Sequence, residues 1–103
     1  MSSPLHVVVH LHAGGGGVAA LRAWERCAVE IMRRHGARLR IAFEPEPAPG
    51  RNGPDEIHVI EFPDRRALEA YRADPAMAAL ADGRAEAVAR SELFVSRALV
   101  DYG

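Results

Sequence analysis

Apolar and polar residues alternate along the first part of the chain. The segment LHVVVHLHA, from Leu5 to Ala13, has a period of two and is rich in valine, which predicts a strand with one apolar face. The four glycines that follow end this strand, because they add backbone freedom and pack no side chain. The apolar face consists of Leu5, Val7, Val9 and Leu11, and the opposite face of His6, Val8, His10 and His12.

Three further segments predict strands: Arg38–Glu44, Glu56–Phe62 and Leu93–Tyr102. Between the first two of these, at least half of PEPAPGRNGP is proline or glycine, which predicts a long loop over residues 45–54. In the Arg38–Glu44 strand an apolar face alternates with a charged one. The apolar face is made of Leu39, Ile41 and Phe43, and the charged face of Arg38, Arg40 and Glu44.

Two regions predict helices. From Val18 to His35 apolar residues recur every three or four positions and form one stripe, with basic residues in the last turn and a glycine as the stop. Asp64–Ala73 predicts a second helix whose first residue is a good N-cap. Asp74 and Pro75 then begin a further helical piece, which runs from about Pro75 into the alanine-rich stretch before Ser91.

The predicted order is β-α-β-β-α-β. With short connections and right-handed crossovers, this order gives an α+β, ferredoxin-like fold: a four-stranded antiparallel sheet with both helical regions on one face. We expect residues 1–103 to form one domain. The other face of such a sheet, called the open face here, must be polar, covered or buried in an oligomer.

The composition limits the classes of partner that we expect this protein to bind. The 13 basic and 14 acidic residues give a net charge of −1, so no electrostatic feature points to nucleic acid or an anionic membrane. No apolar run approaches the ~20 residues of a membrane helix, and the N-terminus lacks a signal-peptide pattern. Cys27 is the single cysteine, so no intrachain disulfide can form. We therefore expect a cytoplasmic protein.

The run VIEFPDRRALEAYRADPAMAAL, from Val59 to Leu80, resembles an uncharacterised family of the dimeric α/β-barrel superfamily. The resemblance rests on the strand end Ile60-Glu61-Phe62-Pro63, an alanine-rich helix with Tyr71, and the break at Asp74-Pro75; Arg84 stands where the family often has an arginine. It implies a homodimer in which two open faces pack together into a barrel.

The chain departs from that family in its first helix, where GGGGVAALRAW replaces an aspartate and two tyrosines, and at Met77, where an aromatic residue is common. Relatives in the superfamily include cofactor-free monooxygenases, haem-degrading enzymes, muconolactone-type isomerases and polyketide cyclases. Others have no known reaction, so the resemblance implies a fold and does not select one reaction.

The open face carries His6, His10 and His12, for which three interpretations stay open. The imidazoles can fill a partly polar interface, act as acid–base or ligand-contacting groups, or bind a metal with a third ligand such as Glu61. If Ile60 and Phe62 fill the core, Glu61 joins the histidines. We prefer this arrangement, because Phe62 abuts the next helix.

In the alternative, where Ile57 and Val59 fill the core, His58 joins the histidines instead. From the second strand Arg38 and Arg40 face the same space, where they could hold a carboxylate or enolate oxygen or pair with acidic residues. The tetraglycine has no following Lys-Ser/Thr, so it predicts a turn or a ligand-gating loop rather than a phosphate site.

The leading hypothesis is a homodimer that binds a small organic molecule and, if it is an enzyme, performs isomerisation, cyclisation or a monooxygenase-like reaction without metal or cofactor. His10 or His12 would move the proton, Glu61 would assist, and Arg40 would stabilise negative charge, with ligand contacts from His6, His58 and Arg38. The alternatives are a non-enzymatic binding or accessory dimer and a histidine metal site.

Overall fold

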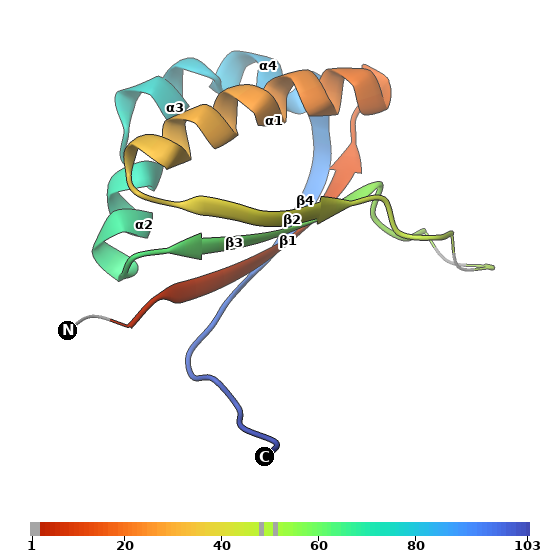
Figure 1. Ribbon diagram of the computed structural model, residues 1–103. Helices are drawn as coiled ribbons and strands as arrows, with labels where there is room; N and C mark the ends of the chain where they lie inside the picture. The colour runs from red at the N-terminus through yellow and green to blue at the C-terminus, as the bar shows by residue number, and fades with distance from the viewer. Residues whose placement is uncertain (1–2, 48, 51) are drawn as a thin grey trace.

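The computed structural model describes residues 3–47, 49–50 and 52–103. One antiparallel sheet, with strand order β2-β3-β1-β4, is covered on one face by four helices, and the other face is open (Figure 1). This arrangement is the expected ferredoxin-like α+β fold. Along the chain the elements are β1 (Leu5–Ala13), α1 (Gly17–Arg34), β2 (Arg38–Phe43), β3 (Glu56–Phe62), α2 (Arg65–Arg72), α3 (Pro75–Ala79), α4 (Ala81–Ala87) and β4 (Val88–Val95).

The helix starts at Asp64 and Asp74 are confirmed. The Asp64 carboxylate accepts a bond from the Ala67 N–H at 2.8 Å, and Asp74 accepts one from the Ala76 N–H at 2.9 Å. Side-chain caps of this kind pair backbone donors that a helix leaves free. The helical piece that begins at Pro75 differs from the prediction in being divided into α3 and α4.

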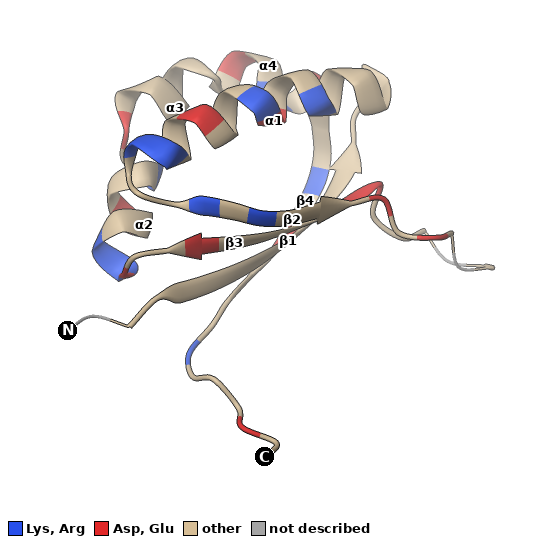
Figure 2. Cartoon of the chain, in the orientation of Figure 1, with Lys and Arg blue, Asp and Glu red and all other residues tan. Residues whose placement is uncertain are grey.

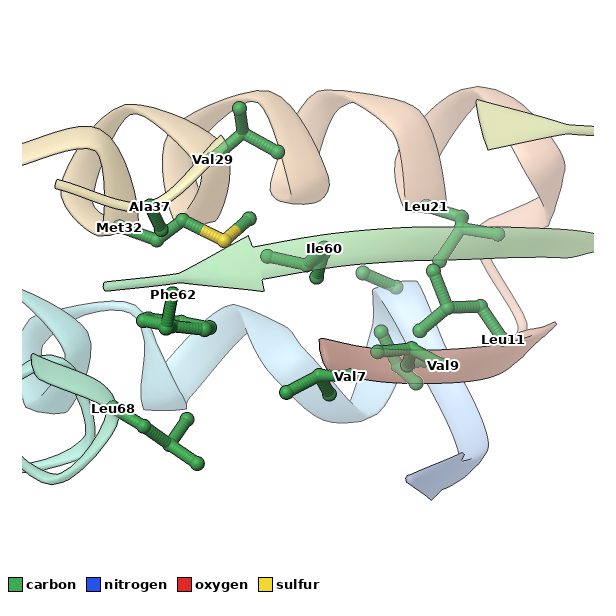
Figure 3. Close-up of a cluster of buried hydrophobic side chains, with 12 residues drawn as sticks. Val7, Val9, Leu11, Leu21, Val29, Met32, Ala37, Ile60, Phe62 and Leu68 are labelled. Atoms are coloured by element: carbon green, nitrogen blue, oxygen red, sulfur yellow. The ribbon is translucent and has the colours of Figure 1, made fainter. Parts of the chain in front are cut away.

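The core lies between the helices and the sheet (Figure 3). Val7, Val9 and Leu11 of β1 are buried there, as the alternation predicted. Ile60 and Phe62 of β3 are also buried, so the preferred orientation of this strand is confirmed. Burial of such side chains contributes roughly 1.5–3 kcal/mol each, which fixes which face of each strand meets the helices.

The predicted apolar face of β2 is wrong beyond Leu39. A register shift between Leu39 and Ile41 inserts Arg40 as an extra residue, and Ile41 then pairs with Val59 and Phe43 with Ile57. Residues that pair in this way share a face, so Ile41 and Phe43 turn to the open face. They are 53% and 44% exposed.

The last strand was predicted five residues too late. The alanine-rich helix ends at Ala87, and β4 runs from Val88 to Val95 rather than from Leu93 to Tyr102. Pairing with β1 ends where the Ser96 N–H donates to the His6 carbonyl at 2.8 Å. Beyond Ser96 the chain runs away from the sheet without regular structure (Figure 1).

The glycine turn has a structural role. The N–H groups of Gly14 and Gly16 donate to the Ala87 and Glu86 carbonyls, both at 3.0 Å. A Cβ at Gly14 would lie 2.5 Å from the Glu86 oxygen, so only glycine permits this close backbone approach. Because these donors are already bonded, the turn does not offer them to a phosphate.

Within the predicted loop after β2, Ala48 and Arg51 lie outside the described residues, and the described remainder forms neither helix nor strand.

Candidate active site

The open face brings some of the predicted residues together. Glu61 Oε2 lies 3.9 Å from both His6 Nε2 and Arg40 Nε, so these three side chains form one loose cluster. Arg38 is exposed and pairs in register with Glu61. In Figure 2 basic positions on β2 lie beside an acidic position on the neighbouring strand β3. At distances near 4 Å on an exposed face, such ion pairs contribute little.

His10 and His12 have other neighbours. The His10 ring packs edge-on against Phe94, with ring centroids 5.5 Å apart. His12 Nε2 lies 3.3 Å from Glu92 Oε1 and 3.2 Å from Arg90 Nη2. Among the described residues no three His, Cys, Asp or Glu side chains converge as a metal-binding group. The two histidines therefore do not share one centre within a single chain.

The remaining open-face side chains are mostly apolar. They form a continuous surface across all four strands, called the open-face apolar patch here. Its exposed members reach 53% for Ile41 and 56% for Phe94. In full, the patch consists of Val8, Ile41, Phe43, Ile57, Val59 and Phe94.

His58 lies on the opposite side, under helix α1, and is 2% exposed. Its Nε2 is 2.7 Å from Glu56 Oε1, and the other Glu56 oxygen accepts a bond from Arg22 Nε at 2.9 Å. Since a carboxylate only accepts, Nε2 carries the proton in the neutral imidazole and Nδ1 keeps its lone pair. The arrangement is that of a histidine oriented by a buried carboxylate.

Glu25 of α1 faces that lone pair, with its Oε2 4.0 Å from His58 Nδ1. Burial raises the pKa of the Glu25 carboxyl, and His58 opposes this only in part. Burial also works against ionisation of Glu56, but the hydrogen bonds from His58 and Arg22 outweigh it and lower the pKa of Glu56. The two carboxyl groups beside His58 are thus shifted in opposite directions, a pattern typical of acid–base sites.

Two cavities meet at this point. The outer cleft has a volume of about 470 Å³ and is lined from α1 and the sheet by Arg22, Arg26, Arg33, Leu39 and Glu56. The inner cavity has a volume of about 160 Å³ and is lined mainly by apolar and aromatic side chains, among them Trp24, Phe62, Tyr71, Met77 and Leu93. Both volumes are also lined by Glu25 and His58, so this pair forms the wall between them.

The polar groups of the inner cavity are arranged around Trp24. Its indole N–H donates to the Leu80 carbonyl at 3.0 Å, and the Arg84 guanidinium lies 5.8 Å from the ring centroid. Arg84 in turn donates to Ser91 Oγ at 3.0 Å. Burial, together with the charge of Glu25, raises the pKa of Tyr71 to about 12, so its hydroxyl stays protonated and can donate to a ligand.

The sequence analysis did not include Glu25 or Glu56 among the candidate site residues. It included His58 only for the case in which this residue faces the open side of the sheet, whereas the structure places it under α1. Glu25 follows Leu21 by one helical turn, so it interrupts the buried stripe of α1. Glu56 and His58 share the face of Ile60 and Phe62. Polar residues on a face assigned to the core are a signal available in the sequence.

The family model for the domain of unknown function DUF1330 matches residues 17–98. The chain belongs to this family. No protein with a curated description matches the DUF1330 chain. The match includes α1 and β3, and so every residue of the His58 cluster, whereas His6, His10 and His12 precede it.

Solved structures share the fold of this DUF1330 protein. A protein of unknown function from Rhodopseudomonas palustris, RPA0582, aligns with a TM-score of 0.79 and 18% identity, over 98% of this chain and 86% of that one. A putative antibiotic biosynthesis monooxygenase from Bacteroides thetaiotaomicron aligns with a TM-score of 0.70 and 14% identity, over 97% and 93% of the chains. SnoaB from Streptomyces nogalater, a cofactor-independent oxygenase, aligns with a TM-score of 0.71 and 12% identity, over 98% of both chains.

These structural neighbours are ferredoxin-like proteins of the dimeric α/β-barrel type, as the sequence resemblance implied. At such identities the likeness establishes the fold and leaves the reaction open. Within the described part of the chain, no helix is both long enough and apolar enough to cross a membrane.

Proposed function

We propose that this protein binds a small organic molecule in the inner cavity and removes a proton from it, with His58 as the base. The observation that carries the proposal is the buried His58–Glu56 pair in the wall shared by both cavities, where His58 Nδ1 keeps its lone pair 4.0 Å from Glu25 Oε2. A general base needs an available lone pair, a fixed orientation and access to substrate, and His58 meets all three. The role first assigned to His10 or His12 thus passes to His58.

The neighbouring groups fit a proton transfer without a resident cofactor. Proton uptake by His58 gives an imidazolium between Glu56 and Glu25, which stabilises the positive charge. The Tyr71 hydroxyl lines the same cavity and can donate to the negative charge left on the substrate. An enolate or phenolate formed in this way can isomerise, cyclise or react with O₂. SnoaB, which has the same fold, is described as a cofactor-independent oxygenase.

We infer that the open-face apolar patch is the contact surface of a homodimer. Ile41, Phe43 and Phe94 expose about half of their surface in one chain, and large contiguous apolar patches of this kind are typical of interaction sites. Neighbours of the dimeric α/β-barrel type support the same assignment. His6, His10 and the Glu61–Arg40 cluster would then lie at the dimer interface, and His58 would act as the base.

The test is a comparison of two histidine variants. We expect His58→Gln to lower turnover roughly 10²- to 10⁴-fold on a panel of enolisable ketones and phenols assayed for isomerisation and O₂ uptake, as loss of a general base does. His10→Gln, on the open face, is the matched control and should retain turnover within about twofold. Full activity of His58→Gln on a substrate turned over by the wild type would refute the assignment.

A further inference from the structure

We propose that the substrate of this site is a molecule with a single six-membered ring that carries one acidic hydroxyl, a phenol or a cyclic enol of that size. The ring would occupy the inner cavity, and its hydroxyl would face the Glu25–His58 wall. This inference rests on the proposed function, because it assigns the hydroxyl proton to His58. It names the class of molecule, which neither the family description nor the fold provides.

The size of the cavity limits the ligand to one ring. Its volume is about 160 Å³. An engineered apolar cavity of about 150 Å³ in another protein binds benzene, so the inner cavity suits one benzene-sized ring. A second fused ring would need space that core side chains such as Phe62 and Leu68 already fill, and packed cores do not yield such space without cost.

The cavity wall favours a flat, apolar ring. Trp24 and Tyr71 provide aromatic surfaces, and Met77 and Leu93 provide flexible apolar ones. The Trp24 N–H is bonded to the Leu80 carbonyl, which leaves its ring for packing. Apolar and aromatic walls with a few fixed polar groups are typical of sites for small organic ligands.

The polar groups left to a ligand are few. Arg72 and Arg84 are exposed at the rim, and Arg84 is bonded to Ser91. His58 Nδ1, the Glu25 carboxyl and the Tyr71 hydroxyl have no hydrogen-bond partner within the described residues. The cavity wall therefore offers the His58 Nδ1 lone pair as an acceptor and the Tyr71 hydroxyl as a donor, with the Glu25 carboxyl beside them.

An acidic hydroxyl matches these groups better than a hydrocarbon or a carboxylate does. A hydrocarbon would leave His58 Nδ1 buried without a donor, which costs about 1–3 kcal/mol. A carboxylate would lie beside Glu25, which lines the same cavity, and would be repelled by its negative charge. A hydroxyl donates to Nδ1; when its O–H bond breaks, the N–H bond forms on His58 and the ring oxygen keeps the electron pair, accepting a bond from Tyr71.

The single tryptophan makes occupancy of the cavity directly measurable. Trp24 is the only tryptophan in the chain and lines the inner cavity, so its fluorescence reports a ligand there. We suggest 4-nitrophenol as the probe, because its phenolate absorbs visible light and its phenol does not. We expect saturable quenching of Trp24 by 4-nitrophenol, corrected for quenching of free tryptophan, and no saturable quenching by the two-ring analogue 4-nitro-1-naphthol.

A pair of leucine variants tests whether the probe lies in the inner cavity. Leu93→Phe adds volume to the cavity wall and should weaken 4-nitrophenol binding roughly tenfold. Leu99→Phe makes the same change in the exposed C-terminal segment and should leave binding unchanged. Equal or tighter binding of the naphthol, no saturable quenching by 4-nitrophenol, or no effect of Leu93→Phe would overturn the single-ring assignment.

Absorbance separates this inference from the proposed function. At mildly acidic pH the wild type should raise the phenolate band of bound 4-nitrophenol, and His58→Gln should bind the ring without raising it. If both proteins bind the probe and neither raises the band, the ring assignment stands and His58 is not the base. If 4-nitrophenol does not bind while His58→Gln still abolishes turnover of a larger substrate, His58 remains assigned as the base and the single-ring assignment is wrong.

Discussion

The two faces of the sheet use the same residue types in opposite ways. The open face carries His6, His10 and His12, which have partners at 3.2 Å or more or an aromatic neighbour, and are at least partly accessible. The helix-side face carries one histidine, His58, which is 2% exposed and 2.7 Å from a carboxylate. A group that is buried and oriented has its lone pair and charge fixed by the protein rather than by water.

The comparison teaches that the number of histidines on a face is a poor guide to chemistry. The open face offers the larger number, yet its side chains lie among apolar residues that suit a contact between two chains. The helix-side face offers one imidazole, with a cavity on either side of the wall to which it belongs. Accessible volume beside an oriented group is what a reaction requires.

The largest expected effect comes from removing the carboxylate that orients His58. Glu56→Ala should lower the free energy of unfolding by about 3 kcal/mol, because it leaves the buried imidazole of His58 without its hydrogen-bond partner, whereas Arg22 keeps its ion pair with Glu44. Glu61→Ala, on the open face of the same strand, should lower it by less than about 1 kcal/mol. Urea unfolding at one fixed protein concentration measures both, and equal losses would remove the distinction between the faces.

Much of the fold could be predicted from local patterns. Alternation assigned the buried face of β1, and the caps at Asp64 and Asp74 placed two helix starts correctly. The β2 bulge could not be found in this way. Its segment alternates without interruption, and only the register against β3 shows that Arg40 is the extra residue. Pairing between segments distant in sequence decides such features.

The candidate site was harder to predict than the fold, because it joins residues from α1 and β3. Glu56 and His58 are neighbours on one face of β3, but Glu25 comes within ion-pairing range of His58 only after α1 packs on the sheet. The sequence contained a usable signal nonetheless. Once Ile60 and Phe62 are assigned to the core, Glu56 and His58 must share their face, and a glutamate interrupts the apolar stripe of α1.

The second-largest expected effect is on dimerisation through the open face. Ile41→Glu places a charge in the open-face apolar patch and should raise the dissociation constant of the dimer by roughly 100-fold, since burying an unpaired charge costs several kcal/mol. Leu99→Glu, at an exposed apolar residue outside the patch, is the control and should change the dissociation constant little. Sedimentation over a range of concentrations measures both, and a wild-type protein that stays monomeric throughout would refute the dimer.

The dependence of stability on pH should differ in sign between two carboxyl groups beside His58. The folded pKa of Glu25 is raised, mainly by burial, so its contribution is fully present below the ordinary pKa of about 4.5 and is lost as pH rises. Glu25→Gln should therefore stabilise the protein at pH 7 and not at pH 4. The groups that face Glu25 are His58 and Glu56 from β3, Tyr71 from α2 and Arg84 from α4.

Glu56 should behave in the opposite way, because its folded pKa is lowered and its contribution is present above the ordinary pKa and lost as pH falls. Glu56→Gln should therefore destabilise the protein more at pH 7 than at pH 4. Urea denaturation of the two variants at both pH values checks the signs. Parallel shifts of both variants would show that the two carboxyl groups share one environment.

The smallest expected effect involves His10 and the open face. His10 packs against Phe94 in the open-face apolar patch and forms no ion pair among the described residues, although Glu92 is its register partner in β4; a charge on its imidazole would therefore be buried on dimerisation without a carboxylate in contact. Acidification from about pH 8 to pH 5 should weaken the dimer a few-fold, and His10→Gln should remove that dependence. His12→Gln is the matched control, because His12 already lies between charged groups of opposite sign, Glu92 at 3.3 Å and Arg90 at 3.2 Å. If His10→Gln retains the full pH response and His12→Gln loses it, the charge that opposes dimerisation is that of His12 rather than His10.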